Sequence, residues 1–329
     1  MNYKAFVVRE NEDGTFKRSI ETKSIDDLPQ GEVLIRVKYA ALNYKDALSA
    51  SGHKGISKTY PHTPGVDAVG EVVNCSTSEF QEGDKVIVTS YDFGMNTSGG
   101  FQEYIRVPAA WPVKLPESMS MEESMILGTG GFTAALSLYK MEQCGQTPEM
   151  GPILVTGSTG GVGSMAVAIL ALNGYEVIAA TGKVEEHEYL KKLGATSIVS
   201  REDVNDESGR PLLRPKWAGA IDTIGDNTLA TCIKACGRNG SVAVCGLVAS
   251  PNLNTTVYPL ILNGVNILGI ETAETPRNIR LKIWELLANE WKPKAHLESI
   301  KNIISLNELE TAIDAMLNGK SKGRTLIKM

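Results

Sequence analysis

A glycine-rich segment, Thr156–Gly163, carries the clearest chemical signal in the sequence. It follows the strand expected at Ile153–Thr156 and precedes Ser164–Asn173, which has the spacing of a helix. Backbone amides at the start of a helix bind anions, and glycine allows the backbone to approach a pyrophosphate closely. The pattern therefore predicts a dinucleotide site, and its alternative is a tight turn without a ligand. The residues expected to contact the dinucleotide are Thr159, Gly160, Gly161 and Val162.

The residues that would read the adenosine ribose indicate which coenzyme binds. NAD sites place Asp or Glu at the end of the second strand, but the strand expected at Glu176–Thr181 has no carboxylate at its tip. Thr181, Gly182 and Lys183 stand there instead, and Arg201 follows the next strand. A hydroxyl, a free amide and two cations suit a 2′-phosphate, so the sequence predicts NADPH. The alternative is that Lys183 and Arg201 are solvated surface cations.

The elements that must position these residues change in character along the chain. The first ~125 residues favour β-strands, because short apolar runs are separated by glycine and proline. After Ser120, strands alternate with helices of about ten residues, which predicts a parallel sheet covered on both faces. The helices expected are Met121–Leu127, Phe132–Cys144, Glu185–Leu193, Arg277–Trp291 and Leu306–Asn318. The later strands expected are Ser197–Val199, Ala218–Thr223, Ser241–Cys245, Asn266–Ile270 and Thr325–Lys328.

Composition excludes several classes of protein. The chain has 329 residues, of which 42% are hydrophobic and 22% charged, so it is a globular protein of about two domains. Its net charge is −5 and no dense basic cluster occurs, which argues against a nucleic-acid partner. No apolar run approaches the ~20 residues that span a bilayer, and the polar N-terminus does not resemble a signal peptide. Five scattered cysteines without a C-x-x-C motif fit a reducing cytoplasm.

Dispersed motifs resemble the medium-chain dehydrogenase/reductase superfamily, and within it the YhdH/YhfP group of quinone oxidoreductases and acryloyl-CoA reductases. The resemblance runs from about residue 3 to residue 328. Its motifs are Asn43–Leu48, Pro64–Asp67, Gly128–Ala134, Gly219–Asp226 and Gly323–Leu326. It implies an α/β fold with a GroES-like, β-rich catalytic domain made of residues 1–124 and 293–329. Residues 125–292 would form a Rossmann domain with a doubly wound parallel sheet, and NADPH would lie in the cleft between the two.

The same resemblance implies that no zinc is used. Zinc-dependent relatives carry a cysteine where this chain has Asn43, and a His-Glu pair where it has Val66 and Asp67. The four-cysteine lobe is also missing, since no cysteine occurs between Cys75 and Cys144. A catalytic zinc needs three protein ligands, so we expect no metal. The chemistry that remains is hydride transfer from NADPH to an activated alkene or a quinone.

Asn43 and Tyr44 are the catalytic candidates, because the resemblance places them beside the nicotinamide. When an α,β-unsaturated thioester is reduced, negative charge collects on its carbonyl oxygen and its α-carbon needs a proton. The Asn43 amide can donate to that oxygen, and the Tyr44 phenol can donate a proton or only position the ring. Tyr44 as a buried aromatic with a satisfied hydroxyl is the alternative. Asp46 either orients Lys45 or Asn43, or caps the next helix, and Asp67 is expected to make a structural hydrogen bond.

The resemblance and the strand ends suggest further coenzyme contacts. Thr129 and Thr133 would line the cleft, unless they are a helix cap and a core threonine. Leu247, Ile270 and Thr272 follow later strands at the edge where doubly wound sheets bind ligands. Arg324 would bind a phosphate of the coenzyme or substrate, or else form an ion pair between the domains.

These observations predict a zinc-independent, NADPH-dependent reductase of the C=C bond of a small acyl-CoA such as acryloyl-CoA. An NADPH:quinone oxidoreductase and a non-catalytic NADPH-binding sensor are the alternatives. A homodimer is also expected, because the family pairs the last Rossmann strand across a two-fold axis. Here that strand is Asn266–Ile270, whose apolar edge favours a partner.

Overall fold

The computed structural model describes residues 1–329, which form two units with separate β-sheets. The first unit contains residues 1–129, 272–281 and 300–329, and the second contains residues 130–271 and 282–299. The segment 272–281 belongs to the first unit because arginines anchor it there: Arg277 donates to the carbonyls of Ala110 and Pro112, and Arg280 donates to that of Thr89. The domain limits expected at residues 124/125 and 292/293 stay a prediction.

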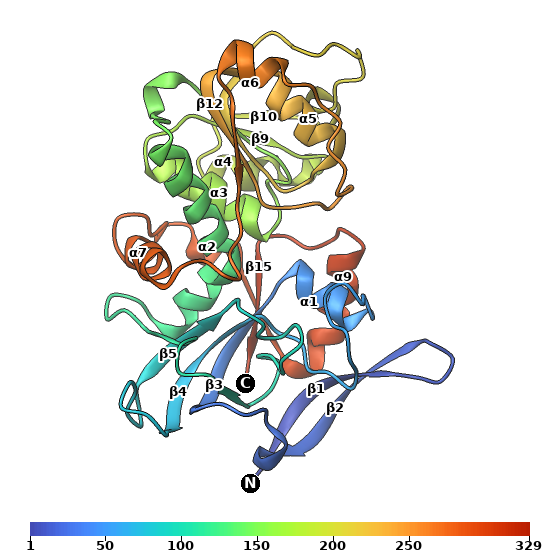
Figure 1. Ribbon diagram of the computed structural model, residues 1–329, viewed down its shortest axis with the longest axis vertical. Helices are drawn as coiled ribbons and strands as arrows, with labels where there is room; N and C mark the ends of the chain where they lie inside the picture. The colour runs from blue at the N-terminus through green and yellow to red at the C-terminus, as the bar shows by residue number, and fades with distance from the viewer. The chain divides into compact units, whose positions relative to one another are not determined.

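The first unit is mainly antiparallel. A long hairpin joins β1 to β2, and the other strands form one sheet in the order β14-β15-β3-β4-β5-β7, with β6 also paired to β3. Helices α1 and α9 lie side by side next to this sheet (Figure 1). The strands are β1 (Asn2–Glu10), β2 (Phe16–Ser24), β3 (Val33–Leu42), β4 (Asp67–Cys75), β5 (Lys85–Thr89), β6 (Tyr104–Val107), β7 (Val113–Lys114), β14 (Lys301–Ser305) and β15 (Arg324–Lys328), and the helices are α1 (Tyr44–Ala50) and α9 (Leu309–Leu317).

The second unit is a parallel sheet of six strands in the order β10-β9-β8-β11-β12-β13. The chain leaves the centre in opposite directions from β8 and β11, and right-handed crossovers then place helices on both faces. Helix α3 packs on β8 and β9, whereas α5 packs on β11 and β12 (Figure 1). The elements are β8 (Ile153–Val155), β9 (Val177–Ala180), β10 (Ser197–Val199), β11 (Trp217–Asp222), β12 (Cys236–Val244), β13 (Asn266–Gly269), α3 (Gly161–Leu172), α4 (His187–Lys192), α5 (Asp226–Lys234) and α6 (Tyr258–Asn263).

Three helices have residues in both units: α2 (Met121–Gln143), α7 (Arg277–Ala288) and α8 (Leu297–Ile300). Helix α2 is interrupted at Gly128, whose φ of 47° and ψ of −153° are not helical. The sequence predicted two separate helices on either side of this glycine, and the break confirms that prediction. No helix of the chain is both long enough and apolar enough to cross a bilayer.

Several elements differ from their predicted limits. Helix α3 begins at Gly161, three residues before the predicted Ser164, because the glycines themselves take part in its first turn. Strand β12 begins at Cys236 rather than Ser241, since an irregular register lets Cys236 pair with Trp217. The helix predicted from Glu185 divides into a 3₁₀ turn and α4. Strands β2 and β14 were not predicted, because their alternation of apolar and polar residues is weak.

Candidate functional site

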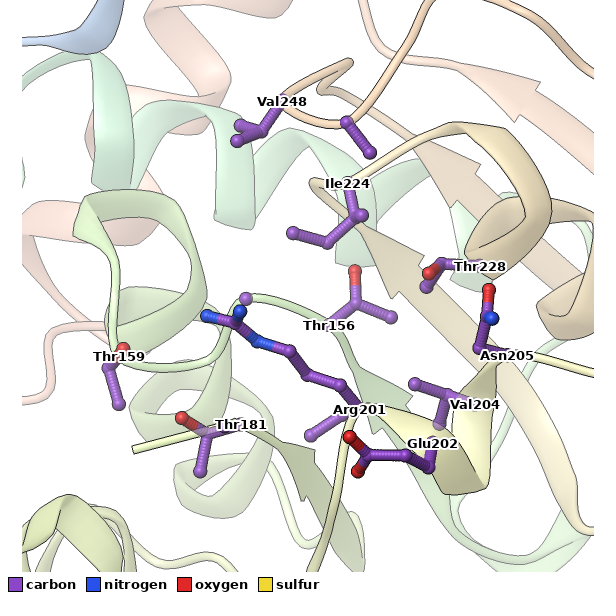
Figure 2. Close-up of a pocket in the computed structure, with 14 residues that line it drawn as sticks. Thr156, Thr159, Thr181, Arg201, Glu202, Val204, Asn205, Ile224, Thr228 and Val248 are labelled. Carbon is purple, nitrogen blue, oxygen red and sulfur yellow. The ribbon is translucent and has the colours of Figure 1, made fainter. Parts of the chain in front are cut away.

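A pocket of about 450 Å³ opens at the C-terminal edge of the parallel sheet in the second unit. It lies where the strand order reverses between β8 and β11, the position at which doubly wound sheets bind nucleotides. Figure 2 shows its side chains converging from the ends of several strands. Its lining residues are Thr156, Gly157, Thr159, Ala180, Thr181, Gly182, Arg201, Glu202, Val204, Asn205, Ile224, Thr228, Val248 and Ala249.

The glycine-rich turn forms one wall of this pocket. Gly157 has a φ of +56°, a conformation that side chains other than glycine rarely adopt. Gly163 packs so close to the turn that a Cβ there would lie 2.3 Å from the Gly157 carbonyl oxygen. Gly160 precedes α3, and Gly161 and Val162 form its first turn. The first amides of a helix have no partner within the helix, so the start of α3 offers donors to an anion at this edge of the sheet.

Arg201 supplies the cation of the pocket. Its side chain extends from the end of β10 across the pocket toward Thr159 and Thr181 (Figure 2). A Cβ at Gly182 would lie 2.6 Å from Arg201 Nε, so glycine at this position makes room for the guanidinium. An arginine beside a threonine hydroxyl is suited to a phosphate, because its planar donors match phosphate oxygens.

Lys183 is not among the residues that line the pocket. Its backbone amide donates to Thr181 Oγ1 at 3.0 Å, which turns the chain at the strand end. Of the two cations predicted to bind the 2′-phosphate, the structure therefore brings Arg201 into the pocket, whereas Lys183 shapes its rim through the backbone.

The first unit contains a second polar cluster, centred on the fully buried Asp67. Asp67 Oδ2 accepts hydrogen bonds from Asn43 Nδ2 at 2.9 Å, from the Thr129 amide at 2.9 Å and from Arg324 Nη2 at 3.1 Å. Its other oxygen accepts the Thr129 hydroxyl. The cluster thus joins the start of β4, the loop before α1, the interrupted turn of α2 and the start of β15.

Arg324 is almost completely buried, and protein acceptors occupy all three of its nitrogens. Besides Asp67, it donates to Asn43 Oδ1 at 2.8 Å and to the Ile126 carbonyl at 3.2 Å. Burial lowers the pKa of Arg324, and the charge of Asp67 opposes that effect. The structure therefore favours the ion pair over phosphate binding for Arg324, and this pair lies within the first unit rather than between the domains.

Asn43 and Tyr44 occupy different environments. Asn43 is the cap of α1, and its side-chain amide is committed to Asp67 and Arg324. The donor that the sequence assigned to a substrate oxygen is therefore already used within the protein. Tyr44 is the first residue of α1 and is 38% exposed, so its phenol is accessible. This exposure disfavours the alternative of a buried, satisfied aromatic.

Asp46 lies in the first turn of α1 and is fully buried. It accepts the amides of Asn43 at 2.8 Å, Val66 at 2.9 Å and Gly65 at 3.2 Å. Burial, and then the negative charge of Asp67, raise the pKa of Asp46 to about 7. It thus acts at the third position of a capping box rather than as the cap itself, and it orients Asn43.

The remaining predicted residues are dispersed. Thr133 is buried within α2, where its carbonyl accepts the Ser137 hydroxyl. Leu247 is 59% exposed on the loop after β12. The Ile270 amide donates to Val244, and the Thr272 carbonyl accepts Arg280. None of these four residues lines the pocket, and their coenzyme contacts stay predictions.

Sequence reasoning missed the pocket wall formed by Glu202, Val204, Asn205, Ile224 and Val248. These residues follow β10, β11 and β12, so the rule that ligands bind at the C-terminal ends of parallel strands could have found them. The structure contains no group of three or more His, Cys, Asp or Glu side chains that could hold a metal ion.

Comparisons with known proteins agree with this architecture. Residues 29–117 match the alcohol dehydrogenase GroES-like domain, and residues 161–289 match the zinc-binding dehydrogenase family. YhfP of Bacillus subtilis (strain 168) is 43% identical over 310 residues, 94% of each chain. The chain belongs to the medium-chain dehydrogenase/reductase family, in its YhdH/YhfP group.

Other members of this family resemble the chain over its full length. Acrylyl-CoA reductase AcuI of Ruegeria pomeroyi is 40% identical over 326 residues, which are 99% of this chain and 98% of that protein. The crystal structure of the yhdH oxidoreductase from Salmonella enterica in complex with NADP has a TM-score of 0.96 and 39% identity, with full coverage of both chains. Bacillus subtilis yhfP with NAD bound also has a TM-score of 0.96, with 42% identity and full coverage. These members confirm the GroES-like and Rossmann fold classes.

Gly128 tests the tight packing around Asp67. A Cβ at Gly128 would lie 2.5 Å from both Arg324 Nη2 and Asp67 Oδ2, and φ is +47°. Gly83 in the same unit also has a positive φ, of +87°, but a Cβ there would meet nothing within 4 Å. We expect Gly83→Ala to lower the free energy of unfolding by roughly 1 kcal/mol, and Gly128→Ala to lower it by at least about 2 kcal/mol. Urea unfolding measures both, and equal losses would contradict this view of the cluster.

The raised pKa of Asp46 makes the free energy of unfolding depend on pH. Because its folded pKa lies above that of an unfolded aspartate, the folded state binds more protons between about pH 4 and pH 7. The contribution of Asp46 to the free energy of unfolding is therefore most favourable below pH 4. It declines as the pH rises to about 7, by at most about 1.4 kcal/mol per unit. Urea unfolding from pH 4.5 to 8 should show a smaller decline for Asp46→Asn than for the wild type. Parallel curves would show that Asp46 ionises normally.

Proposed function

We propose that the chain is a zinc-independent, NADPH-dependent reductase of the C=C bond of a small α,β-unsaturated acyl-CoA, with acryloyl-CoA as the model substrate. The observation that carries the proposal is the full-length similarity to acrylyl-CoA reductase, on a chain whose nucleotide pocket holds Arg201. The residues of the pocket fit the coenzyme: the glycine turn offers amides to a pyrophosphate, and Val204, Ile224 and Val248 offer apolar surface to a base.

Arg201 and Thr181 are proposed to bind the 2′-phosphate. The arginine lies in the pocket beside a glycine that leaves space for it, and no carboxylate stands at the end of β9 to hold a ribose hydroxyl. Glu202, one residue further, also lines the pocket and could hold the second ribose hydroxyl or the base. Bound NADPH supplies a hydride; the protein supplies binding, orientation and a proton.

Tyr44 is proposed as the catalytic residue that gives the proton. Its phenol is exposed at the start of α1, while the neighbouring Asn43 is held by Asp67 and Arg324. We therefore assign Asn43 a positioning role: it fixes the first turn of the helix, and with it the direction of the Tyr44 side chain. A donor held in one place lowers the cost of reaching the transition state.

We also propose that the protein forms a homodimer in the cytoplasm. Strand β13 is the edge of the parallel sheet, and Ile267 on it is exposed. Ile261 and Leu262 of α6, the helix that precedes β13 in the chain, are exposed as well, and exposed apolar residues together with an open strand edge favour pairing with a second copy.

Coenzyme oxidation tests the proposed function. NADPH absorbance at 340 nm should fall with acryloyl-CoA, and much less with a quinone or without an acceptor. Arg201→Gln should weaken NADPH binding at least about tenfold but leave NADH binding unchanged, because a charge-assisted hydrogen bond to the extra phosphate is lost. Arg238→Gln, which changes an exposed arginine of the same unit, is the matched control.

Two outcomes would contradict the proposal. Turnover with the quinone alone would support the alternative of a quinone oxidoreductase, a name carried by a Sus scrofa protein that is 31% identical over 53% of this chain. Tight binding of NADPH with no turnover on any acceptor would support the sensor.

Tyr44→Phe tests the proton donor. Loss of general acid catalysis should lower kcat with acryloyl-CoA about 100-fold, while the Kd for NADPH stays within about threefold of the wild-type value. Tyr39→Phe removes a phenol from the neighbouring strand β3 and is the control. A Tyr44→Phe enzyme with full kcat would show that the proton comes from elsewhere.

A further inference from the structure

We propose that Asp222 is a positioning residue for the coenzyme. Its buried carboxylate holds together two turns that line the nucleotide pocket: the glycine-rich turn after β8 and the turn at residues 223–225 after β11. This inference rests on the proposed function, since it concerns how NADPH binding is prepared. Asp222 itself is the last residue of β11 and does not line the pocket.

The first set of contacts fixes the glycine-rich turn. Thr156 Oγ1 donates to Asp222 Oδ1 at 2.7 Å and accepts the Thr223 amide at 2.9 Å. The Thr223 hydroxyl in turn donates to the Thr156 carbonyl at 3.0 Å. Both the side chain and the backbone of Thr156 are thereby locked onto the end of β11. Gly157 follows at once, and a Cβ there would lie 2.3 Å from Thr223 Oγ1, so the two loops are in close contact.

The second set of contacts fixes the loops on the other side. Asp222 Oδ2 accepts the Gly225 amide at 2.8 Å and closes the turn after β11. The Asp222 carbonyl accepts the Cys245 amide at 3.0 Å, and the Ala249 amide donates to the Ile224 carbonyl at 2.9 Å. Ile224 and Ala249 line the pocket, as do Thr156 and Gly157. The carboxylate therefore joins the glycine-rich turn to the turn after β11, and backbone hydrogen bonds join that second turn to the segment 245–250.

Because the Asp222 carboxylate is buried, its stability depends on the hydrogen bonds that it accepts. Asp222 is fully buried, and burial raises the pKa of its carboxyl, while the Thr156 and Gly225 hydrogen bonds act in the opposite direction. A buried carboxylate is tolerated only with its donors in place. The turn thus has one low-energy arrangement before the coenzyme arrives, and pre-organisation of this kind strengthens binding without adding a contact to the ligand.

Thr156→Val and Thr156→Ser form the test. Valine keeps the shape of threonine but removes the hydroxyl, whereas serine keeps the hydroxyl. Titration of the full-length protein with NADPH by calorimetry should give a Kd raised about tenfold for Thr156→Val and within twofold of wild type for Thr156→Ser. The loss should be larger in the KM for NADPH than in kcat, because a positioning role acts on coenzyme binding.

Thr231→Val is the matched control. Thr231 is as buried as Thr156, at 1% exposure, and its hydroxyl also makes two hydrogen bonds, to the Asn227 carbonyl and from the Asp206 amide. It lies in α5 and is not itself one of the residues that line the pocket. Its replacement should lower the melting temperature as Thr156→Val does, but leave the Kd for NADPH within twofold.

The outcomes separate this inference from the proposed function. NADPH binding by Thr156→Val that equals wild type, or a loss that Thr231→Val reproduces, would overturn the role of Asp222 and leave the reductase proposal standing. A folded wild-type protein that binds no NADPH would overturn both. If Thr156→Val does not fold, Thr223→Val and Thr223→Ser remove and retain the reciprocal hydroxyl, and the same difference in Kd is expected.

Discussion

The buried charge of Asp67 is the constraint on which the first unit depends. A carboxylate without water needs an opposite charge and several donors, because an unpaired buried charge costs far more than one protein hydrogen bond returns. Arg324 supplies the charge, while Asn43 and Thr129 supply donors. These partners come from segments as far apart in the sequence as residues 43 and 324, so the ion pair adds to the β3–β15 pairing in holding β15 beside the start of α1.

That constraint explains features that look unrelated in the sequence. Helix α2 breaks at Gly128 because its backbone passes directly against the ion pair, where no side chain fits. The Asn43 side chain donates to Asp67 and accepts from Arg324, so its amide is held within the cluster. Asp46 holds a proton more tightly than an ordinary aspartate because it is buried close to a second negative charge. Tyr44 is left as the accessible polar group at the start of α1.

The second unit also contains a buried carboxylate, that of Asp222, which is stabilised by hydrogen bonds instead of an ion pair. Asp222 is buried, and hydroxyl and amide donors hold it at the edge of the sheet. The result is a stiff rim around a pocket into which Arg201 brings a positive charge. Recognition of a phosphorylated ribose requires donors in fixed positions and a cation that reaches the phosphate. Phosphate is bound by charge and by fixed geometry together.

The sequence alone determined the local features of this protein. Alternating strands and helices predicted the parallel sheet, the glycine turn after Ile153–Val155 predicted the nucleotide site, and Gly128 separated two helical segments, since each signal depends on neighbouring residues. Tertiary structure decided which polar groups are free. Asn43 has the residue type of a substrate donor, and Arg324 that of a phosphate ligand. Both hydrogen-bond to Asp67 instead, which is 24 positions from Asn43 and 257 positions from Arg324. In the sequence Lys183 was the cation at the strand end and Arg201 a second charge. The fold brings Arg201 into the pocket, because side-chain placement is set by contacts between distant segments.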